Sequence, residues 1–205
     1  MSEITSDRTE TLLRQATAGD PQATAKLLER HRSRLRRMIG YRMDSRLVQR
    51  FDPSDVVQEA MLAASVKMPE YLQERPVSFY PWLRRIAWER LVDLQRQHLG
   101  AQRRSVAREE PPPSEFSDDS LNELADSIVP QPSSPLTVLV REERLSHLRE
   151  ALLRLDEQQR EVLVLRYLEG LSLQEVAEVM GTSVASTKMR HMRAIRRLRE
   201  LLQSP

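Results

Sequence analysis

Cysteine is absent from the 205-residue sequence, which excludes disulfides, thiolate metal ligands and cysteine nucleophiles. The sequence also lacks a run of about 18 apolar residues, the length that a membrane-spanning helix needs. Its first residues, MSEITSDRTE, lack the apolar stretch of a signal peptide. We therefore expect a soluble cytoplasmic protein with no membrane partner.

Patterns for catalysis and for metal binding are missing as well. The sequence has no glycine-rich phosphate loop and no nucleophile motif. Its four histidines are too scattered to have the spacing of metal ligands: His31, His98, His147 and His191. We expect no catalytic residue, no metal site and no cofactor, and hence a protein that is not an enzyme.

Sheet-forming sequence is scarce too. There are only five glycines, β-branched residues rarely follow one another, and apolar residues recur at helical spacing almost throughout. The prediction is an all-α protein with two small helical domains, at 1–100 and 137–205, joined by a flexible linker at 101–136. The linker holds six of the 12 prolines and, between residues 109 and 126, seven acidic residues without a basic one. Within it, only residues 121–124 suggest a brief helical turn.

Helix starts in the N-terminal domain repeat one signal, an aspartate N-cap followed by a proline at the first helical position. The signal occurs as Asp20-Pro21 and again as Asp52-Pro53. Prolines further along interrupt the helical pattern and predict a loop. We expect helices at 8–18, from Pro21, from Pro53 to Pro69 and at 79–99, with the loop at 69–78.

The helix that begins at Pro53 has an acidic outer face. Its apolar residues point inward, which leaves four polar side chains outward near its start: Asp52, Asp55, Gln58 and Glu59. In a chain this rich in arginine, such a face is a candidate protein-binding surface. The alternative is an ordinary solvated helix start, where the helix dipole favours acids.

The helix at 79–99 combines a core face with a second face of aromatic and basic residues. Tyr80, Arg84 and Trp88 recur there at steps of four, with Arg85 and Arg96 nearby. Rings that stack on bases and guanidinium groups that pair with phosphates form a platform for single-stranded nucleic acid. The alternative is that Trp88 packs against Leu91 or a neighbouring helix.

We expect the C-terminal domain to begin near Thr137 with one helix, followed by a second helix that Asp156 caps and that runs to about Leu168.

The domain ends in a helix-turn-helix pattern, GLSLQEVAEVMGTSVASTKMRHMRAIRRLR. Ser172 and Glu175 have the spacing of a capping box, Gly181 permits a sharp turn, and Ser183 caps the next helix. That helix has an inward stripe: Val184, Thr187, His191, Ala194, Ile195, Leu198 and Leu202. Its other faces carry six basic residues and no acid up to Arg199, as in a helix that lies in the DNA major groove. A basic helix by itself is also compatible with a solvated surface.

Three stretches resemble the bacterial RNA polymerase sigma factors of the extracytoplasmic-function (ECF) type. DPSDVVQEAMLAA is similar to the acidic helix of sigma region 2, and FYPWLRRIAWERLVDLQRQ is similar to the promoter-reading and melting segment after it. LDEQQREVLVLRYLEGLSLQEVAEVMGTSVASTKMRHMRAIRRL is similar to region 4. The resemblance implies a protein with regions 2 and 4 only, which binds core RNA polymerase and directs promoter recognition, DNA melting and transcription initiation.

The resemblance also implies roles for individual residues. The β′ clamp helices of the polymerase would be bound by the acidic face, Asp52, Asp55, Gln58 and Glu59, and the β flap by region 4. The upstream promoter element would be read by Arg166, Lys188, Met189, Met192 and Arg193. The melted element would be held by Tyr80, Arg84, Arg85, Trp88 and Arg96. An anti-sigma factor is a further partner that the family suggests and the sequence leaves open.

Two departures from the family pattern concern these sites. Trp88 stands where the family commonly has asparagine, and Thr187 and His191 take inward positions where aliphatic residues are usual. We interpret His191 as a packing variant, with a pH-sensitive or base-contacting role as the alternative. The alternative for the whole chain is a stand-alone regulator, in which the helix-turn-helix binds an operator while a helical N-terminal domain senses a ligand or dimerises.

Overall fold

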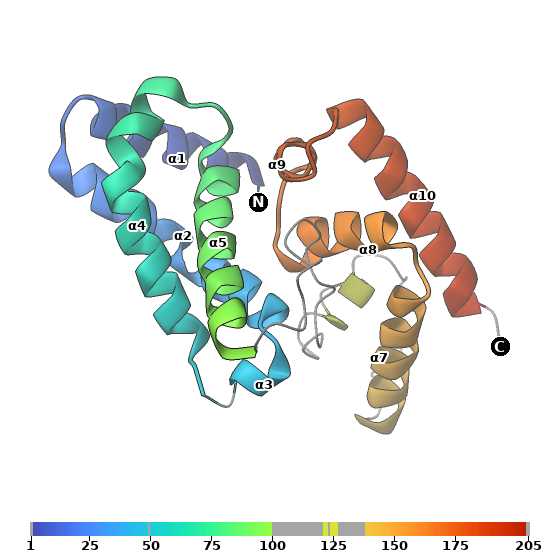
Figure 1. The fold of residues 1–205 in the computed structure, drawn as a ribbon. Coiled ribbons are helices and arrows are strands. Elements are labelled where there is room, and N and C mark those ends of the chain that lie inside the picture. Colours follow the sequence, from blue (N-terminus) through green and yellow to red (C-terminus); the bar gives the residue numbers. More distant parts are fainter. Residues whose placement is uncertain (1, 49, 100–120, 123, 127–137, 204–205) are drawn as a thin grey trace. The chain divides into compact units, whose positions relative to one another are not determined.

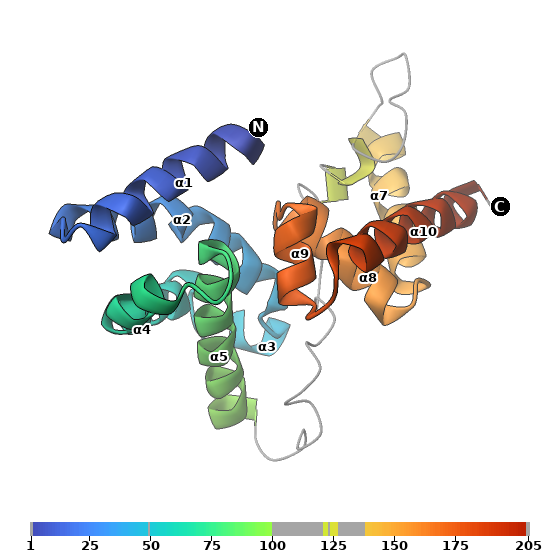
Figure 2. The same cartoon turned by 90° about the horizontal axis from the view of Figure 1, so that it is seen from above.

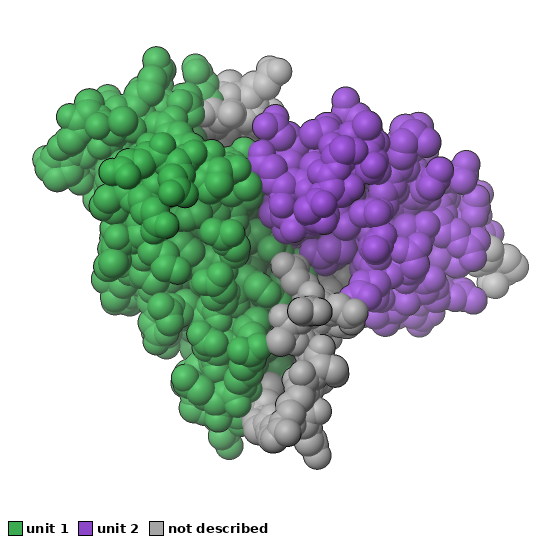
Figure 3. All heavy atoms as spheres, turned by 45° about the horizontal axis from the view of Figure 1, so that its top comes forward, with its two compact units in different colours: residues 1–114 green, residues 115–205 purple. Residues whose placement is uncertain are grey.

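The computed structural model describes residues 2–48, 50–99, 121–122, 124–126 and 138–203, and every regular element within them is a helix. The chain divides into two compact units, Met1–Ser114 and Glu115–Pro205 (Figure 3). The expected all-α class is confirmed. The predicted linker boundaries fall largely outside the described residues and stay a prediction. Among the helices that the structure describes, none combines the length and hydrophobicity that a membrane crossing requires.

The N-terminal unit is a layered helical bundle. Its elements are α1 (Ser2–Thr17), α2 (Pro21–Arg42), α3 (Ser45–Val48), α4 (Pro53–Glu74) and α5 (Phe79–Leu99). α4 packs along α5 and both contact α2, while α1 packs on α2 and touches α4 (Figures 1 and 2). Apolar side chains from three of these helices are fully buried between them: Leu27, Leu35, Met38, Ile39, Val57, Leu83 and Leu91.

Both predicted aspartate caps are present. Asp20 Oδ1 accepts a hydrogen bond from the Gln22 amide at 2.8 Å, and Asp52 Oδ1 accepts one from the Ser54 amide at 2.7 Å. In each helix a proline occupies the first turn, where no backbone donor is needed. The starts of α2 and α4 are therefore set by local sequence, as predicted.

The end of α4 differs from the prediction, because the helix passes through Pro69 and ends at Glu74. A proline inside a helix costs about 3 kcal/mol through its missing donor and its ring clash. Here Met68 and Tyr71, on either side of the exposed Pro69, are 2% and 3% exposed. The Tyr71 ring also stacks on Trp82, with centroids 4.4 Å apart. Burial of these side chains offsets the loss, so the predicted loop at 69–78 is wrong up to residue 74.

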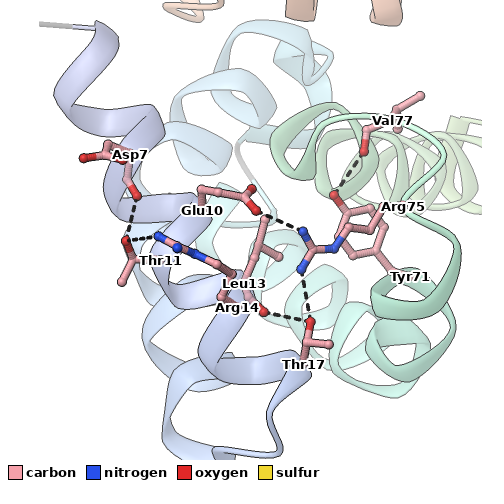
Figure 4. A network of polar contacts seen from close by, with 9 residues as sticks. All are labelled: Asp7, Glu10, Thr11, Leu13, Arg14, Thr17, Tyr71, Arg75 and Val77. Atoms are coloured by element: carbon pink, nitrogen blue, oxygen red, sulfur yellow. Dashed lines mark hydrogen bonds and ion pairs between the residues drawn. The ribbon is translucent and has the colours of Figure 1, made fainter.

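Arg75 ends α4 and ties it to α1 (Figure 4). Its backbone is left-handed, with φ at 40°. One guanidinium nitrogen, Nη1, lies 3.1 Å from Glu10 Oε1, and Nη2 donates to Thr17 Oγ1 at 3.0 Å. These contacts connect the end of α4 to a helix that begins at Ser2, earlier than the expected residue 8.

The C-terminal unit contains the predicted helix-turn-helix. Its elements are α7 (Val138–Leu153), α8 (Glu157–Leu163), the π-helical turn η2 (Val164–Leu168), α9 (Leu173–Val179) and α10 (Val184–Gln203). α10 packs against α7, α8 and α9, and α8 continues directly into η2. The sequence predicted one unbroken helix up to Leu168, so the π-helical turn is a correction. Asp156 caps α8 as expected, since its Oδ1 accepts from the Gln159 amide at 2.8 Å.

Two further differences concern burial in this unit. On α10 the inward side chains are Thr187, Ala194, Leu198 and Leu201, whereas Val184 is 39% exposed and Leu202 is half-buried. Val184 and Leu202 are 18 residues apart, which is five turns of 3.6 residues, so both lie along one edge of the buried stripe, and the predicted inward position is wrong for both. In the expected linker, the described residues of 121–126 are helical, and Leu121, Leu124 and Ala125 are buried.

Candidate nucleic-acid and protein interfaces

The helix-turn-helix is held by local hydrogen bonds at each of its joints. The Glu175 amide donates to Ser172 Oγ at 3.2 Å, and the Ser172 amide donates to Glu175 Oε2 at 2.7 Å, which completes the capping box. Gly181 takes a left-handed φ of 61° at the turn. Ser183 Oγ then accepts from the Ser186 amide at 3.1 Å and caps α10. These contacts fix the direction in which α10 leaves the turn.

The outer face of α10 presents the residues assigned to the upstream element. Lys188 and Arg193 are exposed, and Met189 and Met192 are 50% and 64% exposed. All four lie away from the buried side chains, Thr187, Ala194, Leu198 and Leu201. The arrangement offers charged donors and apolar groups together on a surface that is free of core packing within the described residues.

Arg166, the fifth residue assigned to this element, has a contact within the protein. Its Nη1 donates to the Leu171 carbonyl at 2.8 Å, and the side chain is half-buried. The bond spans the connection between η2 and α9, so this guanidinium braces the start of the helix-turn-helix. A DNA contact by Arg166 stays a prediction.

A groove beside α10 adds residues that the sequence reasoning missed. Its lining combines the start of α8 with the outer face of α10: Asp156, Gln158, Gln159, Ala185, Ser186, Met189, Arg190 and Arg193. The two segments are far apart in the chain, so no local pattern signals that they meet. Gln158 and Gln159 bring amide donors and acceptors next to the basic helix.

The predicted platform on α5 is not an open surface. Tyr80 and Arg84 are each 2% exposed. The guanidinium carbon of Arg34 lies 3.6 Å from the Tyr80 ring centroid, and the His31 ring lies 5.6 Å from it. Both side chains are therefore buried in this structure, contrary to the expected exposed platform, and a DNA contact by either one stays a prediction.

The remaining residues of that prediction are accessible. Arg85 and Arg96 are exposed, and Trp88 is half-buried. The Arg42 guanidinium carbon lies 5.9 Å from the Trp88 ring centroid, so the ring borders the buried Arg42 rather than standing free. The packing alternative for Trp88 therefore holds for part of its surface.

The acidic face of α4 is exposed as expected. The side chains of Asp52, Asp55, Gln58 and Glu59 all reach solvent. Hydrogen bonds from Ser54 lower the pKa of the Asp52 carboxyl, because they stabilise its charged form. Asp52 is thus engaged as a helix cap.

Two apolar residues continue this face, and the sequence reasoning missed both. Leu62 is 64% exposed and Val66 is 80% exposed. They follow Asp55 and Glu59 along α4 at helical steps of three and four, on the side opposite Val56 and the other buried residues. The signal was present in this spacing, because the buried residues of α4 already fill a full stripe without them.

Comparison with known proteins identifies both halves of the chain. Residues 27–100 match Sigma-70 region 2, and residues 146–198 match Sigma-70, region 4. The RNA polymerase sigma factor NccH of Alcaligenes xylosoxydans xylosoxydans is 30% identical over 195 residues, which is 95% of either chain. The ECF RNA polymerase sigma-E factor of Escherichia coli is 30% identical over 196 residues, 95% of this chain and 93% of that protein.

The chain belongs to the ECF RNA polymerase sigma factors. Among solved structures, CnrH in complex with the cytosolic domain of CnrY has the same fold, with a TM-score of 0.53 over 95% of this chain and 97% of that one. Its sequence identity is 24%. In this sigma factor the region 2 match runs from within α2 through α5, and the region 4 match runs from within α7 into α10. A region 2 match in the N-terminal unit sets the stand-alone regulator aside.

Proposed function

We propose that this ECF sigma factor binds core RNA polymerase, brings it to promoters, supports DNA melting there and so starts transcription, with no catalytic step of its own. The observation that carries the proposal is the pairing of two different surfaces in one chain. The C-terminal unit has a basic, exposed recognition helix, and the N-terminal unit has an acidic and apolar face on α4. A subunit that joins polymerase to DNA needs both.

Upstream DNA is the proposed ligand of α10. In a helix-turn-helix the second helix lies in the major groove with its N-terminal part toward the bases. Lys188, Met189, Met192 and Arg193 occupy that part of α10 and are exposed. Basic residues further along, Arg196 and Arg199, are exposed as well and suit the phosphates.

The melted strand is proposed to contact the accessible part of α5. Arg85 and Arg96 supply guanidinium groups, and the open part of Trp88 supplies a ring surface. Tyr80 serves this surface indirectly, because the contacts of its ring with Arg34 and His31 of α2 hold α5 in place. Arg84 is buried as well. The proposed strand contacts are thus fewer than the five residues that the sequence suggested.

Core polymerase is proposed to bind the outer face of α4, through Asp55, Gln58 and Glu59 together with Leu62 and Val66. A carboxylate group beside exposed apolar side chains fits a partner that is both basic and apolar, such as the β′ clamp helices. Region 4 would contact the β flap. CnrH was solved with the cytosolic domain of CnrY; an anti-sigma factor for the present protein stays a proposal.

The test is promoter-directed transcription with purified core polymerase. Replacing Asp55 and Glu59 with lysine should abolish co-elution with the polymerase and run-off transcripts, because both charges reverse on the proposed interface. A matched control replaces the exposed Glu142 and Glu143 of α7 with lysine, which makes the same change in net charge. Normal assembly by the α4 variant would contradict the proposed polymerase interface.

The DNA half has its own variants. Arg193→Ala and Lys188→Ala should each weaken binding to the upstream duplex while the thermal unfolding of the protein stays unchanged, since both side chains are exposed. Loss of one phosphate contact would also reduce the salt dependence of binding by about 0.9 in the log–log slope. Unchanged promoter affinity in both variants would reject this face of α10 as the reader.

A further inference from the structure

The exposed methionines of α10 have no structural explanation in the helix itself. Met189 and Met192 are 50% and 64% exposed, within a segment whose charged residues are all basic from Val184 to Arg199. The core side of α10 is already filled by Thr187, Ala194, Leu198 and Leu201. Two large apolar side chains on the opposite side therefore indicate a ligand with an apolar feature.

Their surroundings indicate what kind of ligand this is. Met189 lines the groove next to Arg190, Arg193 and the α8 residues Gln158 and Gln159. Ala185, Ser186 and Asp156 complete the lining, and Oδ1 of Asp156 accepts a hydrogen bond from the Gln159 amide as the cap of α8. The two cations and the two side-chain amides suit phosphates and base edges. A nucleic acid fits that mixture better than an apolar protein surface does.

The major groove offers one apolar group, the C5-methyl of thymine. Methionine has no hydrogen-bond donor, and its sulfur is only a weak acceptor, so it cannot pair with the polar edges of bases. Its side chain is long, flexible and polarisable, and it adapts to a methyl group at van der Waals distance. Thymine is therefore the base whose chemistry this side chain recognises.

We propose that Met189 and Met192 read thymine methyl groups in the upstream promoter element, beside polar contacts made by Lys188 and Arg193. This inference rests on the proposed function of α10 as the upstream reader. The two methionines are three residues apart, a rise of about 4.5 Å along the helix, and successive bases on a strand are about 3.4 Å apart. Each side chain thus meets a different base pair, and the two pairs are neighbours.

The experiment removes single methyl groups from the DNA. Holoenzyme is assembled from core polymerase and the full-length protein, and its upstream duplex is identified by mapping transcript start sites after overproduction. Each thymine in that duplex is replaced in turn by deoxyuridine, which keeps the base pair and deletes only the methyl group. Wild-type holoenzyme should lose about fourfold in affinity at each thymine that is read, the factor expected for one buried methyl-sized group.

Variants assign each methyl group to its side chain. In Met189→Ala the loss at one thymine should disappear, and in Met192→Ala the loss at the neighbouring one. Met189→Leu, which keeps an apolar side chain, should retain discrimination between thymine and deoxyuridine. Arg193→Ala should bind both duplexes more weakly by the same factor and keep the discrimination.

Three results separate the possible failures. Equal affinity of the wild type for thymine and deoxyuridine at every position, with Arg193→Ala still weakened, would overturn methyl reading and leave the proposed function intact. Met189→Ala and Met192→Ala variants that bind both duplexes more weakly, with the methyl effect unchanged, would also overturn it and assign the methionines to contacts other than thymine methyl groups. Absence of promoter-directed initiation by wild-type holoenzyme would instead remove the proposed function itself.

Discussion

The hydroxyl oxygen of Tyr167 lies 3.1 Å from Nε2 of His191, and the two rings stack with centroids 5.7 Å apart. Tyr167 belongs to the π-helical turn η2, and His191 belongs to α10. The turn is closed by a π-helical hydrogen bond between residues five apart, from the Glu169 amide to the Val164 carbonyl at 3.0 Å. The contact therefore links the irregular end of α8 to the recognition helix, and it gives His191 the partner that a half-buried imidazole needs.

A double-mutant cycle tests this link. Tyr167→Phe should lower the free energy of unfolding by about 1 kcal/mol, the usual net value of one hydrogen bond. His191→Ala should remove the same bond, so the double variant should lose less than the sum of the two single variants. Denaturant unfolding at neutral pH gives the free energy of unfolding of the wild type, the two single variants and the double variant. Strict additivity would show that the two side chains do not interact in solution.

His31 predicts a pH dependence of stability. Burial, and then the charges of Arg34 and Arg30, lower the pKa of His31 from 6.5 to about 3. The unfolded chain protonates His31 more readily than the folded protein does. The contribution of His31 to the free energy of unfolding is therefore complete above pH 6.5 and is lost as the pH falls toward 3. Below pH 6.5 the free energy of unfolding should fall, through this histidine, by up to about 1.4 kcal/mol for each pH unit.

Unfolding measured between pH 7.5 and about 5.5 avoids most carboxylate titration. In that window, the variant His31→Gln, which keeps a neutral polar side chain at this position, should have a flatter pH profile than the wild type. NMR titration of the imidazole would give the pKa directly. Identical profiles for the two proteins, or a His31 pKa near 6.5, would contradict the buried neutral state.

Two small replacements of Arg75 should differ in stability. Both Arg75→Ala and Arg75→Gly lose the contacts to Glu10 and Thr17, which are partly exposed and worth at most about 1 kcal/mol. Only alanine keeps the strain of a left-handed residue at φ 40°, which costs about 1 kcal/mol or more. Arg75→Ala should therefore unfold at a lower temperature than Arg75→Gly. The reverse order would mean that the α4 end relaxes to another conformation.

Thr187 predicts a stabilising substitution. The residue is fully buried, and its Oγ1 has no hydrogen-bond partner within the described residues. Thr187→Val replaces that hydroxyl by a methyl group of similar size and should raise the free energy of unfolding by about 1 kcal/mol. Thr187→Ser keeps the hydroxyl, removes the methyl group and should lower it. A destabilised Thr187→Val protein would reveal a polar contact for the hydroxyl.

The starts of α2, α4, α8 and α9 and the turn of the helix-turn-helix follow from local sequence. The capping side chains accept hydrogen bonds from amides only two or three residues away, as seen for Asp20, Asp52, Asp156 and Ser172. Both partners of each bond therefore lie in one short segment of the sequence. The same holds for Gly181, whose left-handed backbone was expected at the turn. The exposed residues of α10 followed from the period of the helix once its core side was recognised.

What covers each helix face depends on packing between distant segments. Tyr80 and Arg84 had the spacing of an exposed platform, yet Arg34 and His31 of α2 lie against the Tyr80 ring. The path of α4 through Pro69 was likewise set by the helices that pack beside α4. The physical reason is the sequence distance over which each interaction acts. A helix cap acts within one turn, so a short segment predicts it. Burial depends on segments far away in the chain, and a local pattern does not predict how they pack.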